Sequence, residues 1–150
     1  MKNLTKNLLL VSLLGWGLAT AALAAPNKIV TLGPVTLSST LTTNIFSPPT
    51  TTGGTGVPEQ TTNTFYIIRH CRIVNKTGSA ATFSLYKGAS AGNVAGTEII
   101  GTALSVAANS AFDWYGLLRL DSGDTNKFIV GGSGTATALV IDCEAEMGIS

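Results

Sequence analysis

Hydrophobic and polar residues alternate along most of this chain, which is typical of β-strands with one buried face. The longest alternating segment is "TFYIIRHCRIVNKTG", residues 64–78. Residues predicted to share one face of this strand are Phe65, Ile67, Cys71 and Ile73, with Arg69 as the exception. The opposite face is predicted to carry Tyr66, Ile68, His70, Arg72 and Val74. Both faces are partly apolar, so we expect a central strand that is covered on both sides.

Similar segments recur about every ten residues, separated by Gly, Asn, Asp and Ser. After a turn at 75–78, residues 80–88 are predicted to return as a hairpin partner, and further strands are predicted in 97–108, 111–120 and the last 25 or so residues. Seven or eight such strands with no helical pattern after residue 24 predict an all-β, antiparallel β-sandwich or jelly-roll-like domain. An N-terminal hydrophobic segment precedes it.

The chain divides into three parts by composition. Residues 1–24 combine Lys2 and Lys6 with an apolar run and the small residues "ALA" at 22–24, which is typical of a signal peptide cleaved after residue 24. An uncleaved membrane anchor is the alternative, although the run thins into Ala, Gly and Thr at its end. Residues 25–63 are predicted to form one or two N-terminal strands, at a sheet edge because Pro34 has no N–H for a ladder, followed by an extended arm. Residues 64–150 are predicted to form the sandwich core.

The arm is the segment "SPPTTTGGTGVPEQTTNT", residues 47–64. Pro48 and Pro49 favour an extended backbone, and Gly53 and Gly54 disfavour a stable ladder. We therefore expect an exposed arm that contributes to assembly and is dispensable for folding.

Charge and residue types exclude several function classes. Without residues 1–24 the chain has seven basic and eight acidic residues, a net charge of −1, and no basic cluster, which argues against nucleic-acid binding. His70 is the single histidine, so we expect no enzymatic activity, no metal and no cofactor. A solvated turn is predicted at Asp121, Asp124 and Asn126, because their spacing is not that of an EF-hand. A solvent-exposed strand face is predicted at Glu144 and Glu146.

Four aromatic residues are candidates for a binding surface, namely Tyr66, Tyr86, Trp114 and Tyr115. Aromatic rings on a sheet face bind sugars or a partner chain with large contact area and little loss of entropy. The competing interpretation is that these rings cap the core and line an oligomer interface, and we favour it over weak glycan binding.

Cys71 and Cys143 are the two cysteines, and both are predicted to point inward with apolar neighbours. A disulfide forms only if their strands are neighbours, and only in an oxidising compartment. Two separate buried thiols are the alternative for a chain that stays in the cytoplasm.

The phrases "IIRHCRIVNKTGSAATFSLYKG", "AGTEIIGTALSVAANSAFDWYGLLRLDSGD" and "GTATALVIDCEAEMG" give the chain a family resemblance. From residue 28 to the end, including "LTTNIFSPPTTTGG", it resembles the small β-sandwich head-decoration and tail-associated accessory proteins of tailed bacteriophages. The resemblance implies a non-enzymatic virion protein that forms homo-oligomers, with a trimer as the expectation by analogy, and contacts other virion proteins.

A signal peptide does not fit a virion protein that is assembled in the cytoplasm. The alternative is therefore an exported subunit of a bacterial cell-surface structure or filament, with an adhesin-like or carbohydrate-binding role. In that case the protein is secreted, periplasmic or at the cell surface rather than in a virion.

Overall fold

The computed structural model describes residues 27–52 and 61–149. The described part is made of strands and the turns that join them. In chain order the strands are β1 (Lys28–Thr36), β2 (Thr43–Phe46), β3 (Thr51–Thr52), β4 (Thr61–Thr62), β5 (Thr64–Asn75), β6 (Ala81–Gly88), β7 (Leu104–Val106), β8 (Ala111–Asp121), β9 (Phe128–Ser133) and β10 (Leu139–Ile149). Within these residues no helix is long and apolar enough to cross a membrane.

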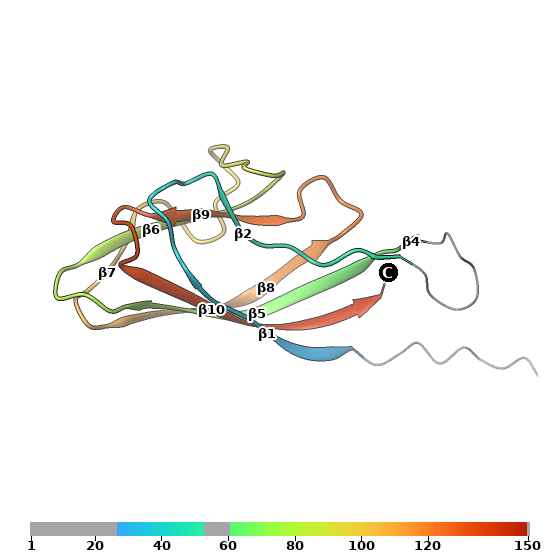
Figure 1. Ribbon diagram of the computed structural model, residues 1–150, viewed down its shortest axis with the longest axis horizontal. Helices are drawn as coiled ribbons and strands as arrows, with labels where there is room; N and C mark the ends of the chain where they lie inside the picture. The colour runs from blue at the N-terminus through green and yellow to red at the C-terminus, as the bar shows by residue number, and fades with distance from the viewer. Residues whose placement is uncertain (1–26, 53–60, 150) are drawn as a thin grey trace, which may run out of the picture.

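Eight of these strands form two four-stranded antiparallel sheets that pack face to face (Figure 1). The first sheet has the order β1-β10-β5-β8, and the second has the order β2-β9-β6-β7. The short strands β3 and β4 pair only with each other. Most consecutive strands of the sandwich lie in different sheets, and β6 and β7 form a hairpin within the second sheet. This strand order is that of a jelly roll, which contains two Greek keys. The predicted all-β sandwich is confirmed.

The core lies between the two sheets and is closely packed. Its largest fully buried apolar side chains are Leu37, Ile68, Ile73, Phe83, Leu85, Leu120, Ile129, Val130, Leu139 and Ile141. The rings of Phe83 on β6 and Phe112 on β8 meet edge to face with centroids 5.5 Å apart, so the two sheets contact each other through aromatic side chains as well as aliphatic ones.

The predicted faces of β5 are correct for its second half and wrong for its first half. Cys71 and Ile73 are buried as expected, but Tyr66 and Ile68 also point into the core. The register of β5 shifts at Arg69 against both neighbouring strands. In the ladder with β10, Arg69 is an extra residue, whereas in the ladder with β8 two residues of that strand, Gly116 and Leu117, lie opposite Arg69. One extra residue exchanges the two faces of a strand, which strict alternation does not anticipate.

The strands β1 and β2, which lie in the predicted part 25–63, belong to the sandwich. β1 pairs with β10 and β2 pairs with β9, so the predicted boundary at residue 63 does not separate these strands from the core. β1 is an edge strand, as predicted, and its register shifts between Leu32 and Val35. Gly33 in that interval has φ +111°, and a Cβ there would lie 2.8 Å from the carbonyl oxygen of Ile141.

Two adjacent residues of β5 that differ in burial provide a direct test of the assigned faces. Ile73 is 0% exposed and Val74 is 38% exposed. Replacement Ile73→Ala is expected to lower the free energy of unfolding by about 2–5 kcal/mol, because it leaves a cavity in the core. Val74→Ala, one residue further along the same strand, is the matched control and should cost about 0.5 kcal/mol. Urea unfolding measures both; equal losses would contradict the assigned faces.

Candidate functional site

The candidate site is the outer face of the first sheet, which carries the side chains that point away from the core. Apolar exposure is concentrated on this sheet. The large apolar residues described as exposed are Ile29, Val74, Tyr115, Leu117 and Ile149 on its strands, and Val94 in a loop. Tyr115 and Leu117, at 74% and 76% exposure, lie two residues apart on β8 and form the most exposed apolar pair.

Charged side chains surround this apolar pair and bind one another across the strands. Arg69 on β5 forms an ion pair with Glu146 on β10, with 2.7 Å between Nη2 and Oε1. His70 Nε2 lies 3.0 Å from Asp113 Oδ1 on β8, and the His70 ring stacks on Tyr115 with centroids 4.6 Å apart. Because these pairs join β10, β5 and β8, they hold the outer face as one surface.

A shallow depression of about 190 Å³ lies on the outer face, lined by Thr31, His70, Arg72, Asp142, Cys143 and Glu144. It combines one imidazole, one guanidinium and two carboxylates. His70, which catalysis would require, is held by Asp113 and Tyr115. No serine hydroxyl hydrogen-bonds to His70 within residues 27–52 and 61–149, so the described residues do not assemble a Ser-His-Asp triad.

Cys71 and Cys143 are joined by a disulfide between the two central strands of the first sheet. They are direct partners in the β5–β10 ladder, with Cα atoms 4.0 Å apart. Each is 2% exposed, so both point inward, as predicted. Of the two alternatives that the sequence left open, the structure has the paired cysteines.

The four candidate aromatic residues do not form one surface, which corrects the idea of an aromatic binding face. Tyr66 and Tyr86 are 9% and 6% exposed. Trp114 is half-buried and packs against the core, which leaves Tyr115 as the single exposed ring of the four. Burial raises the pKa of the Tyr66 phenol, because desolvation disfavours the phenolate.

The arm is fixed to the sandwich at both of its ends. Pro48 is buried, and the Thr64 hydroxyl donates a hydrogen bond to the Pro49 carbonyl. The expectation that this segment forms no ladder is wrong at its ends, where Thr51–Thr52 pairs with Thr61–Thr62. Gly53 and Gly54 lie outside the described residues.

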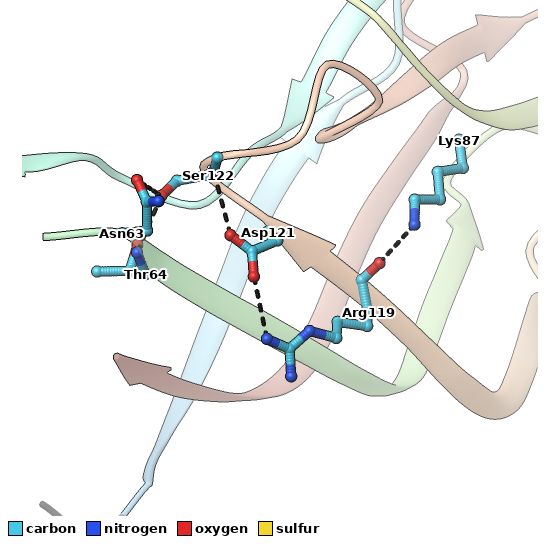
Figure 2. A network of polar contacts seen from close by, with 7 residues as sticks. Asn63, Thr64, Lys87, Arg119, Asp121 and Ser122 are labelled. Carbon is cyan, nitrogen blue, oxygen red and sulfur yellow. Dashed lines mark hydrogen bonds and ion pairs between the residues drawn. The ribbon is translucent and has the colours of Figure 1, made fainter. Parts of the chain in front are cut away.

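The "DSGDTN" loop forms a hydrogen-bonded turn, and Figure 2 shows its first residue, Asp121, directed toward Arg119. The Asp121 carboxylate accepts a hydrogen bond from the Gly123 N–H at 3.1 Å and pairs with Arg119 at 3.0 Å. The Asp124 N–H donates to the Asp121 carbonyl, which closes the turn. Within the described residues, no three His, Cys, Asp or Glu side chains are grouped to hold a metal.

Two features of this face were not predicted from the sequence. Leu117 was not singled out, although it follows Tyr115 at strand spacing and is equally exposed. Phe65 was predicted to share a face with Cys71 and Ile73, but it lies on the opposite face, where it is buried beneath Arg119, whose guanidinium is 4.2 Å from the ring centroid. Arg69 in the middle of an apolar face was the one signal in the sequence that marked the exchange of faces.

Comparison of the chain with protein-family models, with curated proteins and with solved structures finds no match.

Removing the disulfide tests its contribution to stability. The bond closes a loop over a sequence separation of 72 residues, so the double variant Cys71→Ala/Cys143→Ala is expected to lose about 4 kcal/mol of unfolding free energy. Denaturant unfolding of the oxidised protein and of the double variant gives the difference. A change below about 1 kcal/mol would contradict a stabilising cross-link between β5 and β10.

Shortening the arm tests which part of it the fold needs. Thr52 and Thr61 are direct ladder partners, so replacing residues 53–60 by Asn-Gly joins them through a two-residue hairpin loop. We expect the unfolding free energy to change by less than about 1 kcal/mol and assembly to weaken. The expectation that the whole arm is dispensable for folding is corrected by the burial of Pro48 and Thr64. Deletion of all of 47–64 is therefore the contrasting variant and should unfold the protein. Loss of the fold in the short variant would contradict this account.

Proposed function

We propose that the chain is a non-enzymatic structural subunit of a bacteriophage particle, which acts through contacts of the outer face of its first sheet. The observation that carries the proposal is the distribution of exposed apolar residues. Five of the six described ones lie on the strands of that sheet. Two of them, Tyr115 and Leu117, are neighbours on its outer face and are flanked by charged pairs, and an exposed apolar patch with a charged rim is typical of a protein–protein contact surface.

The fold supports a particle component by analogy. Jelly rolls of eight strands are common in viral capsid proteins, although the fold alone does not determine function. The phrases quoted from this sequence resemble phage accessory proteins of the same architecture. The jelly-roll fold and the sequence resemblance thus support a particle component separately from the exposed apolar residues.

The chemistry of the outer face also supports a role in contact rather than catalysis. The polar group best suited to catalysis is already occupied, because His70 is bound by Asp113 and Tyr115. Arg69 and Glu146 neutralise each other. Such pre-formed pairs orient side chains on a surface and add specificity to docking.

A second candidate is an exported subunit of a bacterial surface structure, and the disulfide favours it. Disulfides form and persist mainly in oxidising compartments, and the N-terminal segment 1–24 is predicted to be a signal peptide. A virion subunit would instead fold with reduced cysteines in the cytoplasm. The redox state of Cys71 and Cys143 before lysis therefore separates the two candidates.

The test combines redox state with location. Intact cells producing the protein are treated with a membrane-permeant alkylating reagent before lysis, and purified virions and surface filaments are labelled with an antibody to this chain. The particle proposal predicts alkylated thiols before lysis and label on virions. A disulfide before lysis, seen as a gain of about 2 Da on reduction, with label on surface filaments, would overturn it in favour of the exported subunit.

A further inference from the structure

β8 is an open edge of the first sheet, and its backbone shows which residues can accept another strand. The Asn75 N–H donates to the Ser110 carbonyl, and the Ser122 N–H donates to the Thr64 carbonyl, both at 2.8 Å. In an antiparallel ladder every second residue directs its N–H and C=O groups toward the partner strand. Counted from these two bonds, the even-numbered residues of β8 direct theirs toward β5 on both sides of the register shift. Odd-numbered residues direct their N–H and C=O groups away from the sheet.

Most of these outward backbone groups are open, although β8 carries one extra residue at Gly116–Leu117 in its ladder with β5. Within the described residues, Ala111, Asp113, Tyr115 and Leu117 have no backbone hydrogen bond on the open side. One side chain reaches this edge, since Lys87 Nζ of the second sheet donates to the Arg119 carbonyl at 2.8 Å (Figure 2). β8 has 11 residues and no proline, so it is long enough to template another strand.

We infer that β8 pairs with β8 of a second copy of this chain, antiparallel and with the two-fold axis at Gly116. In this register Asp113 of each copy lies opposite Arg119 of the other, and Tyr115 lies opposite Leu117. Both pairs occur twice. The most exposed apolar residues of the outer face thus cover each other, and the charges beside them are complementary.

The inner side of the edge is complementary in the same register. Trp114 lies opposite Leu118 of the second copy, and Phe112 lies opposite Leu120. Trp114, Phe112 and Leu118 are partly buried apolar residues that pack against the core, so the pairing extends the core across the interface. Gly116 on the axis leaves room for the Trp114 indole, which a Cβ at Gly116 would meet at 2.4 Å.

Neighbouring registers lose this complementarity. Because only odd-numbered residues direct backbone groups outward, the register of one β8 against the other changes in steps of two residues, and each step moves the two-fold axis by one residue. With the axis at Tyr115, Asp113 lies opposite Leu117, and with the axis at Leu117, Asp113 lies opposite Asp121. Only the axis at Gly116 places Asp113 opposite Arg119.

The other edge of the first sheet is less suited to such pairing. β1 contains Pro34, and its register is already interrupted between Leu32 and Val35. Pairing through β8 makes one continuous eight-stranded sheet with a single enlarged outer face. The inference deepens the proposed function and rests on its contact surface, and it names the first partner as a second copy.

The test is disulfide trapping between two different single variants, Tyr115→Cys and Leu117→Cys. Residues opposite in a hydrogen-bonded pair have Cα atoms about 5.5 Å apart, which is within the range of a disulfide. The mixed full-length chains are expected to give a covalent heterodimer under mild oxidation, identified by its mass. Each variant alone should give none. The control Ile29→Cys, exposed on β1, should not cross-link to Leu117→Cys.

Cross-linking of Tyr115→Cys with itself, or of Leu117→Cys with itself, would overturn the register. Light scattering of the unmodified protein should give twice the chain mass; a strictly monomeric or trimeric mass would overturn the pairing. The variant Asp113→Arg should reduce the mass from light scattering to that of one chain, because it places two positive charges opposite each other. The double variant Asp113→Arg/Arg119→Asp should restore the mass of two chains, because it restores the opposite charges. Because antibody labelling of particles does not depend on β8 pairing, a monomer found on virions would reject the dimer and leave the proposed function standing.

Discussion

The pairing of β5 with β10 is the constraint on which the rest of the structure depends. These strands are the two inner strands of the first sheet, and their ladder runs from Leu139 opposite Asn75 to Ile149 opposite Thr64. The Cys71–Cys143 disulfide links them covalently near the middle of this ladder. Because both cysteines point into the core, the bond fixes the register of the sheet and the residues that face the second sheet at the same time.

The outer face follows from the same pairing. The extra residue at Arg69 turns Tyr66 and Ile68 into the core and places Phe65 outside, under Arg119. It also lets Arg69 reach Glu146 across the ladder. A sheet fixed at its centre in this way presents β8 as an edge whose exposed side chains alternate, although its ladder with β5 has one register shift. Assembly through that edge needs no rearrangement of the fold.

The sequence was sufficient for the architecture but not for the details of the site. Alternation and turn residues predicted the sandwich, and Pro34 predicted an edge strand. Alternation cannot locate a bulge, so the faces before Arg69 were exchanged. The burial of Tyr86 and the meeting of Cys71 with Cys143 depend on which distant strands are neighbours, which local patterns do not encode.

Hydrogen–deuterium exchange of the oxidised protein at two concentrations tests the central claim most directly, namely that β8 is the open edge of a sheet fixed by β5 and β10. Amides of Cys71 and Ile73 should exchange slowly at both concentrations, because they lie inside the ladder. Amides of Asp113 and Tyr115 should exchange rapidly in dilute solution and slowly in concentrated solution. Slow exchange of Asp113 and Tyr115 at both concentrations, or fast exchange at both, would contradict the account.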